Sequence, residues 1–505
     1  MLDVSSRADG SLSNSRIEAA YRDRTPGSAK LAQEARQVLP SGIAHDSRHL
    51  KPYSIYIERA RGSRKWDVDG HEYIDYFGGH GSLLLGHCHP AVLAATHAAL
   101  EESTQFGANH PREVRWGQWV QRLIPTAERV RFTASGTEAD LMAVRLARSF
   151  TGKSKLARFK THYHGWSDHM TPGYANHFDG SPTTGVVAGV AASVVLLPPG
   201  DVAAMREAFA ADDDIAAVIL EPTGAAFGTA PLAPSFLAAL REETQKHGIV
   251  LIFDEVVTGF RVSPGGAQAH FGVMPDLTTL AKILAGGFPG GAVCGRREIL
   301  DELDFEATAL NKREKIRHQG TFNANPFSAA AGIAALEIVG TTDACARANA
   351  TGETLRARFN EVLASEDVPW SVYGTFSSFK FFLNPKGRAI KPGKFDPFSI
   401  DYSEILEQPE GLARKFRLAL VVNGVDLNGK LGGIISAVHN EDDVEQTVAA
   451  VRESIRMLKA KGELRSPPSP RPRRSATCPA ARALIILARS SCAARLPSHG
   501  RAIGC

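Results

Sequence analysis

The sequence predicts an α/β protein with a large domain built on a mostly parallel sheet, followed by a smaller C-terminal α+β domain. Short apolar runs at residues 130–134, 215–220 and 250–253 have the length of strands that are buried on both faces. Between the last two, residues 234–247 repeat apolar side chains at helical spacing and end at Gly248. This strand–helix–strand order favours parallel pairing.

The composition is that of a globular protein. Of the 505 residues, 43% are hydrophobic and 22% are charged, which excludes a fibrous, disordered or membrane-spanning chain. The segment from Arg465 onward contains eight arginines, no lysine and no acid. Since the net charge of the whole chain is +4, the rest of the chain carries a charge of −4. The body therefore carries no electrostatic signal for nucleic-acid binding. The apolar run at residues 483–488 is far shorter than the about 20 residues that cross a bilayer.

The N-terminal part divides into two segments. Residues 1–30 are polar and lack a clear period, so we expect a loose arm or a helix that packs elsewhere, with order beginning near Ala32. In the segment 31–90, apolar and polar side chains alternate around the turn Asp69-Gly70. This pattern predicts an antiparallel hairpin within a meander.

The large domain is expected to span residues 91–340 and the small domain residues 341–462. A helix over residues 326–339 leads into the small domain, and strand-like runs occur at residues 378–383 and 417–422. Acids at the start and apolar residues at helical spacing predict an amphipathic closing helix. Its apolar positions are Val444, Val448, Val451, Ile455 and Leu458.

Residues 463–505 form a basic tail that we expect to be disordered, because its Pro, Ser, Arg and Ala content has no period. The tail either touches anionic partners or is an unselected extension. Six cysteines without a CxxC pair argue against a disulfide framework and a zinc ribbon. Residues 1–16 lack the apolar segment of a secretory signal, so we expect a cytoplasmic protein.

The first chemical signal is the sequence Ser135-Gly136-Thr137, which joins a strand to a helix. Small residues at a helix N-terminus leave backbone amides free, and the helix dipole adds positive potential. This segment therefore predicts an anion site, most often for phosphate. The alternative is that Ser135 or Thr137 only caps the helix.

Two further residues are candidates for a catalytic role. Asp254 follows a buried strand at the carboxyl end of the sheet, where ligands of open α/β folds bind, although it could instead cap the next helix. Lys282 stands between apolar residues before a glycine-rich loop. A desolvated amine of lowered pKa can form a Schiff base, but many such lysines only extend to water.

One ligand accounts for all three features in this order. Pyridoxal phosphate has a phosphate, a pyridine nitrogen that a carboxylate keeps protonated, and an aldehyde that a lysine captures. The sequence therefore predicts that Asp254 and Lys282 act on this cofactor.

The sequence resembles the class III pyridoxal-phosphate aminotransferases of fold type I and, among them, the glutamate-1-semialdehyde 2,1-aminomutases. The likeness runs from about residue 30 to about residue 460. Its motifs are Ser135-Gly-Thr-Glu-Ala, Tyr163-His-Gly, Leu220-Glu-Pro, Phe253-Asp-Glu-Val-Val-Thr-Gly-Phe-Arg, Asp276-Leu-Thr-Thr-Leu-Ala-Lys and Gly320-Thr-Phe-Asn-Ala-Asn-Pro.

The resemblance implies a seven-stranded sheet in the large domain and a cofactor enclosed from several sides. Gly136 and Thr137 would hold the phosphate together with Ser135. Tyr163 would stack on one face of the pyridine ring and Val256 would pack on the other, which suits a planar cofactor.

It also implies the catalytic roles. Asp254 would pair with the ring nitrogen, and Lys282 would hold the cofactor as a Schiff base and later act as general base. His164 and Glu221 would belong to the same cofactor-binding set. Thr321 would reach the phosphate of the other subunit, so a homodimer with shared sites is implied.

The substrate stays open. Arg48 lies where related enzymes bind the substrate carboxylate, which a guanidinium suits by its bidentate geometry; the alternative is a surface arginine. The sequence around Arg48 is more similar to that of enzymes acting on β-amino acids. The sequence of residues 427–436 differs from the one usual in aminomutases. Val257 stands where many class III transaminases have a glutamine, which aminomutases also lack. We therefore expect an aminomutase-like enzyme, or alternatively an intermolecular transaminase of a β-amino acid or other ω-amine.

Other features of the sequence allow further hypotheses. Residues 166–190 are either an active-site lid or an ordinary loop. The histidines, among them His162 and His164, lack zinc-like spacing, so no metal is expected. A remote alternative is a cofactor-binding protein without turnover, but a non-catalytic protein has no chemical need for Lys282.

Overall fold

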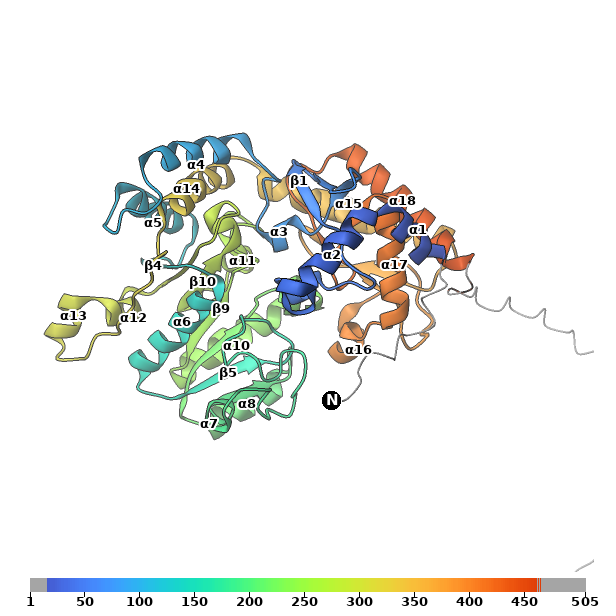
Figure 1. Cartoon of the computed structure of the whole chain (residues 1–505). Helices are drawn as coiled ribbons and strands as arrows, with labels where there is room; N and C mark the ends of the chain where they lie inside the picture. Colours follow the sequence, from blue (N-terminus) through green and yellow to red (C-terminus); the bar gives the residue numbers. More distant parts are fainter. Residues whose placement is uncertain (1–15, 461, 463, 465–505) are drawn as a thin grey trace, which may run out of the picture. The chain divides into compact units, whose positions relative to one another are not determined.

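The computed structural model describes residues 16–460, 462 and 464 (Figure 1). The predicted disordered tail, residues 463–505, lies outside the described residues except for Leu464. Residues 1–15 of the predicted arm also lie outside them.

A seven-stranded sheet forms the centre of the large domain. All neighbouring strands pair in parallel except β11, which is antiparallel to both β4 and β10, so the mostly parallel sheet is confirmed. The order across the sheet is β4 (Arg129–Thr133), β11 (Gly291–Gly295), β10 (Leu277–Ala281), β9 (Val250–Asp254), β7 (Ile215–Leu220), β5 (Lys155–Phe159) and β6 (Val194–Leu197).

Strand β7 and the first four residues of β9 are apolar because helices cover both faces of the sheet. Ile252 of β9 packs into a core with α6, whereas its neighbour Leu251 packs into a core with α8 and α10. Side chains of a strand alternate between faces, so a doubly covered strand needs apolar residues at every position. The helices of this domain are α4 (Pro90–Glu102), α5 (Pro111–Leu123), α6 (Gly136–Thr151), α7 (Ala188–Ala192), α8 (Val202–Ala211), α9 (Ala225–Gly228), α10 (Pro234–His247), α11 (Gly266–Phe271), α12 (Arg297–Leu300), α13 (Phe305–Leu310) and α14 (Pro326–Thr341).

The N-terminal segment is ordered earlier than predicted. The chain is helical from Arg16 in α1 (Arg16–Arg24) and α2 (Pro26–Val38), not only from near Ala32. The reason is that Ile17 and Tyr21 are buried, and the Tyr21 hydroxyl donates to the Tyr53 carbonyl at 2.7 Å. An antiparallel meander follows, and its last strand pairs in parallel with β14 (Val425–Asp426). Its strands are β1 (Ile57–Arg61), β2 (Arg64–Asp67) and β3 (Glu72–Asp75).

The small domain has a three-stranded antiparallel sheet, and one prediction there was wrong. Residues 417–422 are not a strand but the end of helix α17 (Glu410–Val422), buried from Lys415 to Val421. A continuous apolar run has no period that separates a buried strand from a buried helix, so packing decided the outcome. The remaining elements are α15 (Ala344–Ser365), β12 (Ser371–Tyr373), β13 (Ser378–Phe382), α16 (Tyr402–Leu406), β15 (Gly432–Ile434) and α18 (Glu441–Lys459).

Arg261 connects the large sheet with the other two parts of the fold. Its buried guanidinium donates to the Ser377 hydroxyl at 3.1 Å, to the Ile435 carbonyl at 2.9 Å and to the Gly81 carbonyl at 2.9 Å. The loop after β9, the small domain and the N-terminal segment are thereby held together beside the carboxyl edge of the sheet.

Among the described residues, no single helix is long and apolar enough to cross a membrane. Helices α14 and α15 meet the length and composition test only as a pair, and they are bent by 72° relative to each other.

Candidate active site

The predicted site residues follow the carboxyl ends of strands in the seven-stranded sheet. Strands β4, β5, β7, β9 and β10 run in the same direction, so the loops that follow them meet at one edge. Ligands of open α/β sheets bind at this edge. The residues concerned are Ser135, Gly136, Thr137, Tyr163, His164, Glu221, Asp254 and Lys282.

The start of α6 combines a helix cap with free amides. The Ser135 side chain accepts the Glu138 amide at 3.3 Å, so Ser135 is the helix cap. The first amides of a helix, here those of Gly136 and Thr137, have no carbonyl partner within it and can bind an anion. A Cβ on Gly136 would lie 2.9 Å from Val256 Cγ2, so glycine permits the close approach of α6 to the loop after β9.

Asp254 at the end of β9 is buried and held in one orientation. His164 Nδ1 lies 2.7 Å from Asp254 Oδ2, and the Val256 amide donates to Asp254 Oδ1 at 3.0 Å. Burial raises the pKa of Asp254 to about 6, while the Val256 amide and the charge of Lys282 oppose this shift. A carboxylate at neutral pH is therefore available in an apolar setting.

His164 is a neutral donor to Asp254. Burial and the charge of Arg158 lower the pKa of His164 to about 3, so the imidazole is uncharged at neutral pH and its Nδ1 proton points to the carboxylate. Its Nε2 atom is buried and has no hydrogen-bond partner in the described part of the chain.

Glu221 organises the loops around the site. Its carboxylate accepts the backbone amides of Tyr163 at 2.9 Å, Ala226 at 3.1 Å and Phe227 at 3.2 Å. The carboxylate thus fixes the segment that carries Tyr163 and His164 to the loop after β7.

Lys282 directly follows β10 with a left-handed backbone, φ +54°. Non-glycine residues adopt this conformation at a cost, and such strain concentrates at functional sites. Burial lowers the pKa of Lys282, against the opposing charges of Asp254, Glu221 and Asp140. The amine therefore gives up its proton more readily than an ordinary lysine.

The remaining predicted residues lie around this group. Tyr163 is 43% exposed, and its ring centroid is 4.9 Å from that of Tyr174. Arg48 is the last residue of a short 3-10 turn. Burial is the main cause that lowers the pKa of His80 to about 4, and the charges of Arg48 and Lys282 add to this shift. Thr321 is exposed and is not joined to the cluster within the described residues.

Comparison with known families identifies the protein class. A family model described as aminotransferase class-III matches residues 45–390. The chain belongs to the class III aminotransferase family.

Several members of the class III family are similar over most of their length. A curated relative, glutamate-1-semialdehyde 2,1-aminomutase 2 from Brevibacillus brevis, is 36% identical over 444 residues, which cover 85% of this chain and 98% of the relative. An omega-transaminase from Sphaerobacter thermophilus superposes with a TM-score of 0.78 at 32% identity, covering 87% of this chain and 99% of its own. A transaminase solved with PLP bound gives 0.76 at 32% identity, covering 87% and 99%. A beta-phenylalanine aminotransferase from Variovorax paradoxus gives 0.77 at 27% identity, covering 89% and 98%.

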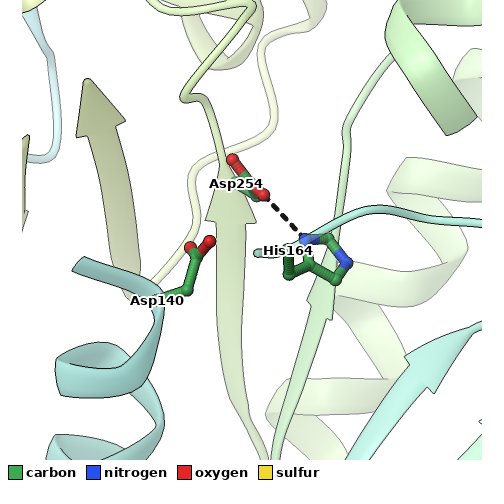
Figure 2. Close-up of side chains that lie close together, drawn as sticks. All are labelled: Asp140, His164 and Asp254. Atoms are coloured by element: carbon green, nitrogen blue, oxygen red, sulfur yellow. Dashed lines mark hydrogen bonds and ion pairs between the residues drawn. The ribbon is translucent and has the colours of Figure 1, made fainter. Parts of the chain in front are cut away.

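The class III site contains a residue that the sequence reasoning missed, Asp140 on α6. Asp140, His164 and Asp254 each place one side-chain atom within 4.8 Å of the others (Figure 2). Asp140 is 2% exposed, and burial together with the charge of Asp254 raises its pKa well above the ordinary value. The sequence does contain a signal for this residue. Asp140 is an acid on the helix face that otherwise carries the apolar residues Ala143, Val144 and Ala147.

The same three side chains could be considered as metal ligands by distance alone. However, His164 Nδ1 and an Asp254 oxygen already share a hydrogen bond of 2.7 Å. The raised pKa of Asp140 further favours a protonated carboxyl group. A His164–Asp254 hydrogen bond beside a protonated Asp140 fits this chemistry better than a cation site.

Proposed function

We propose that this class III aminotransferase uses pyridoxal 5'-phosphate to move an amino group between carbon atoms of small amino-acid or amino-aldehyde substrates. The observation that carries the proposal is the buried Asp254 carboxylate, held by neutral His164 at 2.7 Å, at the same sheet edge as the low-pKa amine of Lys282.

The residues fit this cofactor. The amides of Gly136 and Thr137 at the start of α6 suit its phosphate. The buried His164 Nε2 atom, which has no hydrogen-bond partner among the described residues, is a polar group beside Asp254 that a bound ligand or water can satisfy. Val256 lies against Gly136, and Tyr163 is exposed enough to cover a ring. Asp254 would pair with the ring nitrogen and Lys282 with the aldehyde.

The protein's own groups then have separate tasks. When bound, pyridoxal phosphate supplies an electron sink for the carbon that carries the amine. Lys282 Nζ, with its lowered pKa, takes the proton from that carbon and returns it as general base and acid. Asp254 holds a proton at the ring nitrogen, and His164 keeps the carboxylate oriented. Glu221 keeps the Tyr163 segment in place.

Two substrate classes are candidates. Sequence similarity to the aminomutase of Brevibacillus brevis supports transfer within one molecule of glutamate 1-semialdehyde. Structural similarity to an omega-transaminase and a beta-phenylalanine aminotransferase supports transfer between two molecules, with a β-amino acid or other ω-amine as donor. In both cases Arg48 would bind a substrate carboxylate.

The proposal includes a homodimer with shared sites, in which Thr321 reaches the partner's phosphate. Large apolar side chains are exposed on the same stretch of chain, namely Phe305, Leu310 and Phe322. Exposed apolar patches mark interaction surfaces. A cytoplasmic location is also proposed, and the free thiols of Cys88, Cys294 and Cys345 support it.

Mixing the purified holoenzyme separately with glutamate 1-semialdehyde and with β-phenylalanine, while its cofactor absorbance is followed, tests the proposal. Bleaching by the β-amino acid with release of a keto acid identifies a transaminase. Formation of 5-aminolevulinate without an added acceptor identifies the mutase. No spectral change with either substrate or with other amines contradicts amino-group transfer.

A further inference from the structure

A lysine in the small domain has its charged group buried beside the active site. Lys380 lies on β13, the middle strand of the three-stranded sheet, and is 4% exposed. Its neighbours Phe379 and Phe381 enter the apolar core, so Lys380 leaves from the other face of the sheet. There it crosses Gly432 of β15, where a Cβ would lie 2.8 Å from Lys380 Nζ. Glycine at position 432 therefore makes room for the ammonium.

A second lysine lies near the first, and neither has a counter-ion. Within residues 16–460, 462 and 464, no ion pair or hydrogen bond involves the ammonium group of Lys380 or Lys430. Burial and the charge of Lys430 lower the pKa of Lys380 to about 8. Desolvation by the surrounding protein also lowers the pKa of Lys430, although part of its side chain stays exposed. Glu221 opposes both shifts, but its carboxylate already accepts three backbone amides.

This pair of cations borders the proposed substrate position. Lys430 Nζ lies 5.5 Å from the ring centroid of Tyr174, and that ring lies 4.9 Å from Tyr163. The adjacent Gly429 approaches the Ser47 carbonyl, since a Cβ there would lie 3.6 Å from it. The loop that carries Lys430 therefore packs against the turn that ends in Arg48.

We infer that Lys380 and Lys430 form an anion subsite for the second carboxylate of a dicarboxylic amino or oxo acid, whose first carboxylate binds at Arg48. An uncompensated cation in a partly desolvated place costs free energy, and a bound carboxylate would offset that cost. This inference rests on the proposed function, because it names the substrate class of the same site.

The substrate class has a consequence for the reaction. A monocarboxylic substrate such as glutamate 1-semialdehyde leaves the lysine pair without an anion, whereas a five-carbon dicarboxylic oxo acid supplies one. The inference therefore favours transfer between two molecules. The donor carbon exchanges its amino group for a carbonyl oxygen and the acceptor carbon does the reverse, so no added oxidant or reductant is needed.

Calorimetric titration of the holoenzyme with glutarate and with valerate tests the subsite. Both are unreactive five-carbon acids, and they differ by one carboxylate. We expect glutarate to bind at least tenfold more tightly than valerate. In Lys430→Met and in Lys380→Met, glutarate affinity should fall at least tenfold, while valerate affinity stays within twofold.

Two controls separate charge from general damage. Lys430→Arg keeps the charge and should keep most of the preference for glutarate. Lys246→Met should behave as wild type, because Lys246 lies in the last turn of α10, which runs antiparallel to the strands and finishes at the opposite edge of the sheet. Lys430 is exposed, so its substitution carries the test even if Lys380→Met lowers the melting temperature.

The outcomes distinguish this inference from the proposed function. A wild-type protein without preference for glutarate, or a preference that survives both methionine substitutions, overturns the subsite. The cofactor absorbance of the same samples reports on the proposed function separately. A chain that takes up no pyridoxal phosphate contradicts the proposed function, while the same two titrations of the cofactor-free chain still decide whether the lysines bind a second carboxylate.

Discussion

An oxygen of Asp140 on α6 lies within 4.8 Å of an oxygen of Asp254 at the end of β9, and both carboxyl groups are buried. Two carboxylates at this separation in an apolar setting do not ionise together readily. The raised pKa of Asp140, caused by burial and by the charge of Asp254, makes it the member that keeps its proton. Asp254 is then left as the anion that faces the proposed cofactor.

Asp140→Asn should therefore stabilise the cofactor-free chain. The folded-state pKa of Asp140 is above the unfolded value, so the folded state binds an extra proton once the pH exceeds about 4, and its stability falls as the pH rises. Each pH unit in this window costs about 1.4 kcal/mol, which the neutral amide avoids. Urea unfolding at pH 4 and pH 8 measures the effect. An equal gain at both pH values would mean that the fold does not raise the pKa of Asp140.

Asp254→Asn should separate stability from function. Burial raises the pKa of Asp254 from 3.8 to about 6, so the folded state loses stability between about pH 4 and pH 6 as the pH rises. The substitution should stabilise the cofactor-free chain by about 3 kcal/mol at pH 8 and by almost nothing at pH 4. Turnover should fall at least about a hundredfold, since the ring nitrogen loses its anionic partner. Thermal melts and initial rates check the two effects, and retained turnover would refute the role of Asp254.

His164→Leu should weaken cofactor binding through Asp254. It removes the 2.7 Å hydrogen bond, after which the Val256 amide is the one hydrogen-bond donor to this carboxylate within the described part of the chain. The loss of a hydrogen bond to a charged group costs about 1.5–3 kcal/mol, and we expect at least a tenfold weaker cofactor affinity at pH 7.5. His164→Asn places an amide nitrogen near the Nδ1 position and should recover part of the affinity. Equal affinities of the two variants in fluorescence titrations would show that the hydrogen bond is unimportant.

Lys282→Ala should abolish covalent attachment of the cofactor. Borohydride reduction of the wild-type holoenzyme, followed by peptide mass spectrometry, should place the cofactor mass on Lys282, and the variant should carry none. Turnover should fall by about 10²–10⁴, the usual contribution of a general base, or further because the Schiff base is also lost. Lys246→Ala serves as control. A variant that keeps both the cofactor band and turnover contradicts the assignment.

Thr321 should act across a dimer interface. Lys282→Ala and Thr321→Ala are each expected to be impaired, but their mixed dimers contain one site with Lys282 from one subunit and Thr321 from the other. Unfolding and refolding the two variants together should restore activity to about a quarter of the wild-type level for random pairing. If light scattering shows a monomer, or if mixing restores nothing, the shared site is wrong.

The sequence predicted much of the site because the relevant chemistry is local. Asp254 follows an apolar strand and Lys282 another, and the carboxyl ends of parallel strands necessarily meet at one edge. The sequence alone allows Ser135 to bind an anion or to cap a helix. In the structure it caps α6, and the amides that follow it have no partners within the helix. His164 was placed in the cofactor-binding set, but its bond to Asp254 appears only in the structure.

By itself, the sequence determined the fold class, the helix ending at Gly248, and the order of phosphate, acid and lysine signals, because each depends on residues within one strand or helix. The tertiary structure decided the rest. Whether residues 417–422 form a helix or a strand depended on packing against other elements. Asp140 meets Asp254, and Lys380 comes near Lys430, through segments that are separate in the chain. Such contacts follow from how the helices and strands within each domain pack together, and no local pattern of residues encodes the distances between these side chains or the desolvation that comes with them.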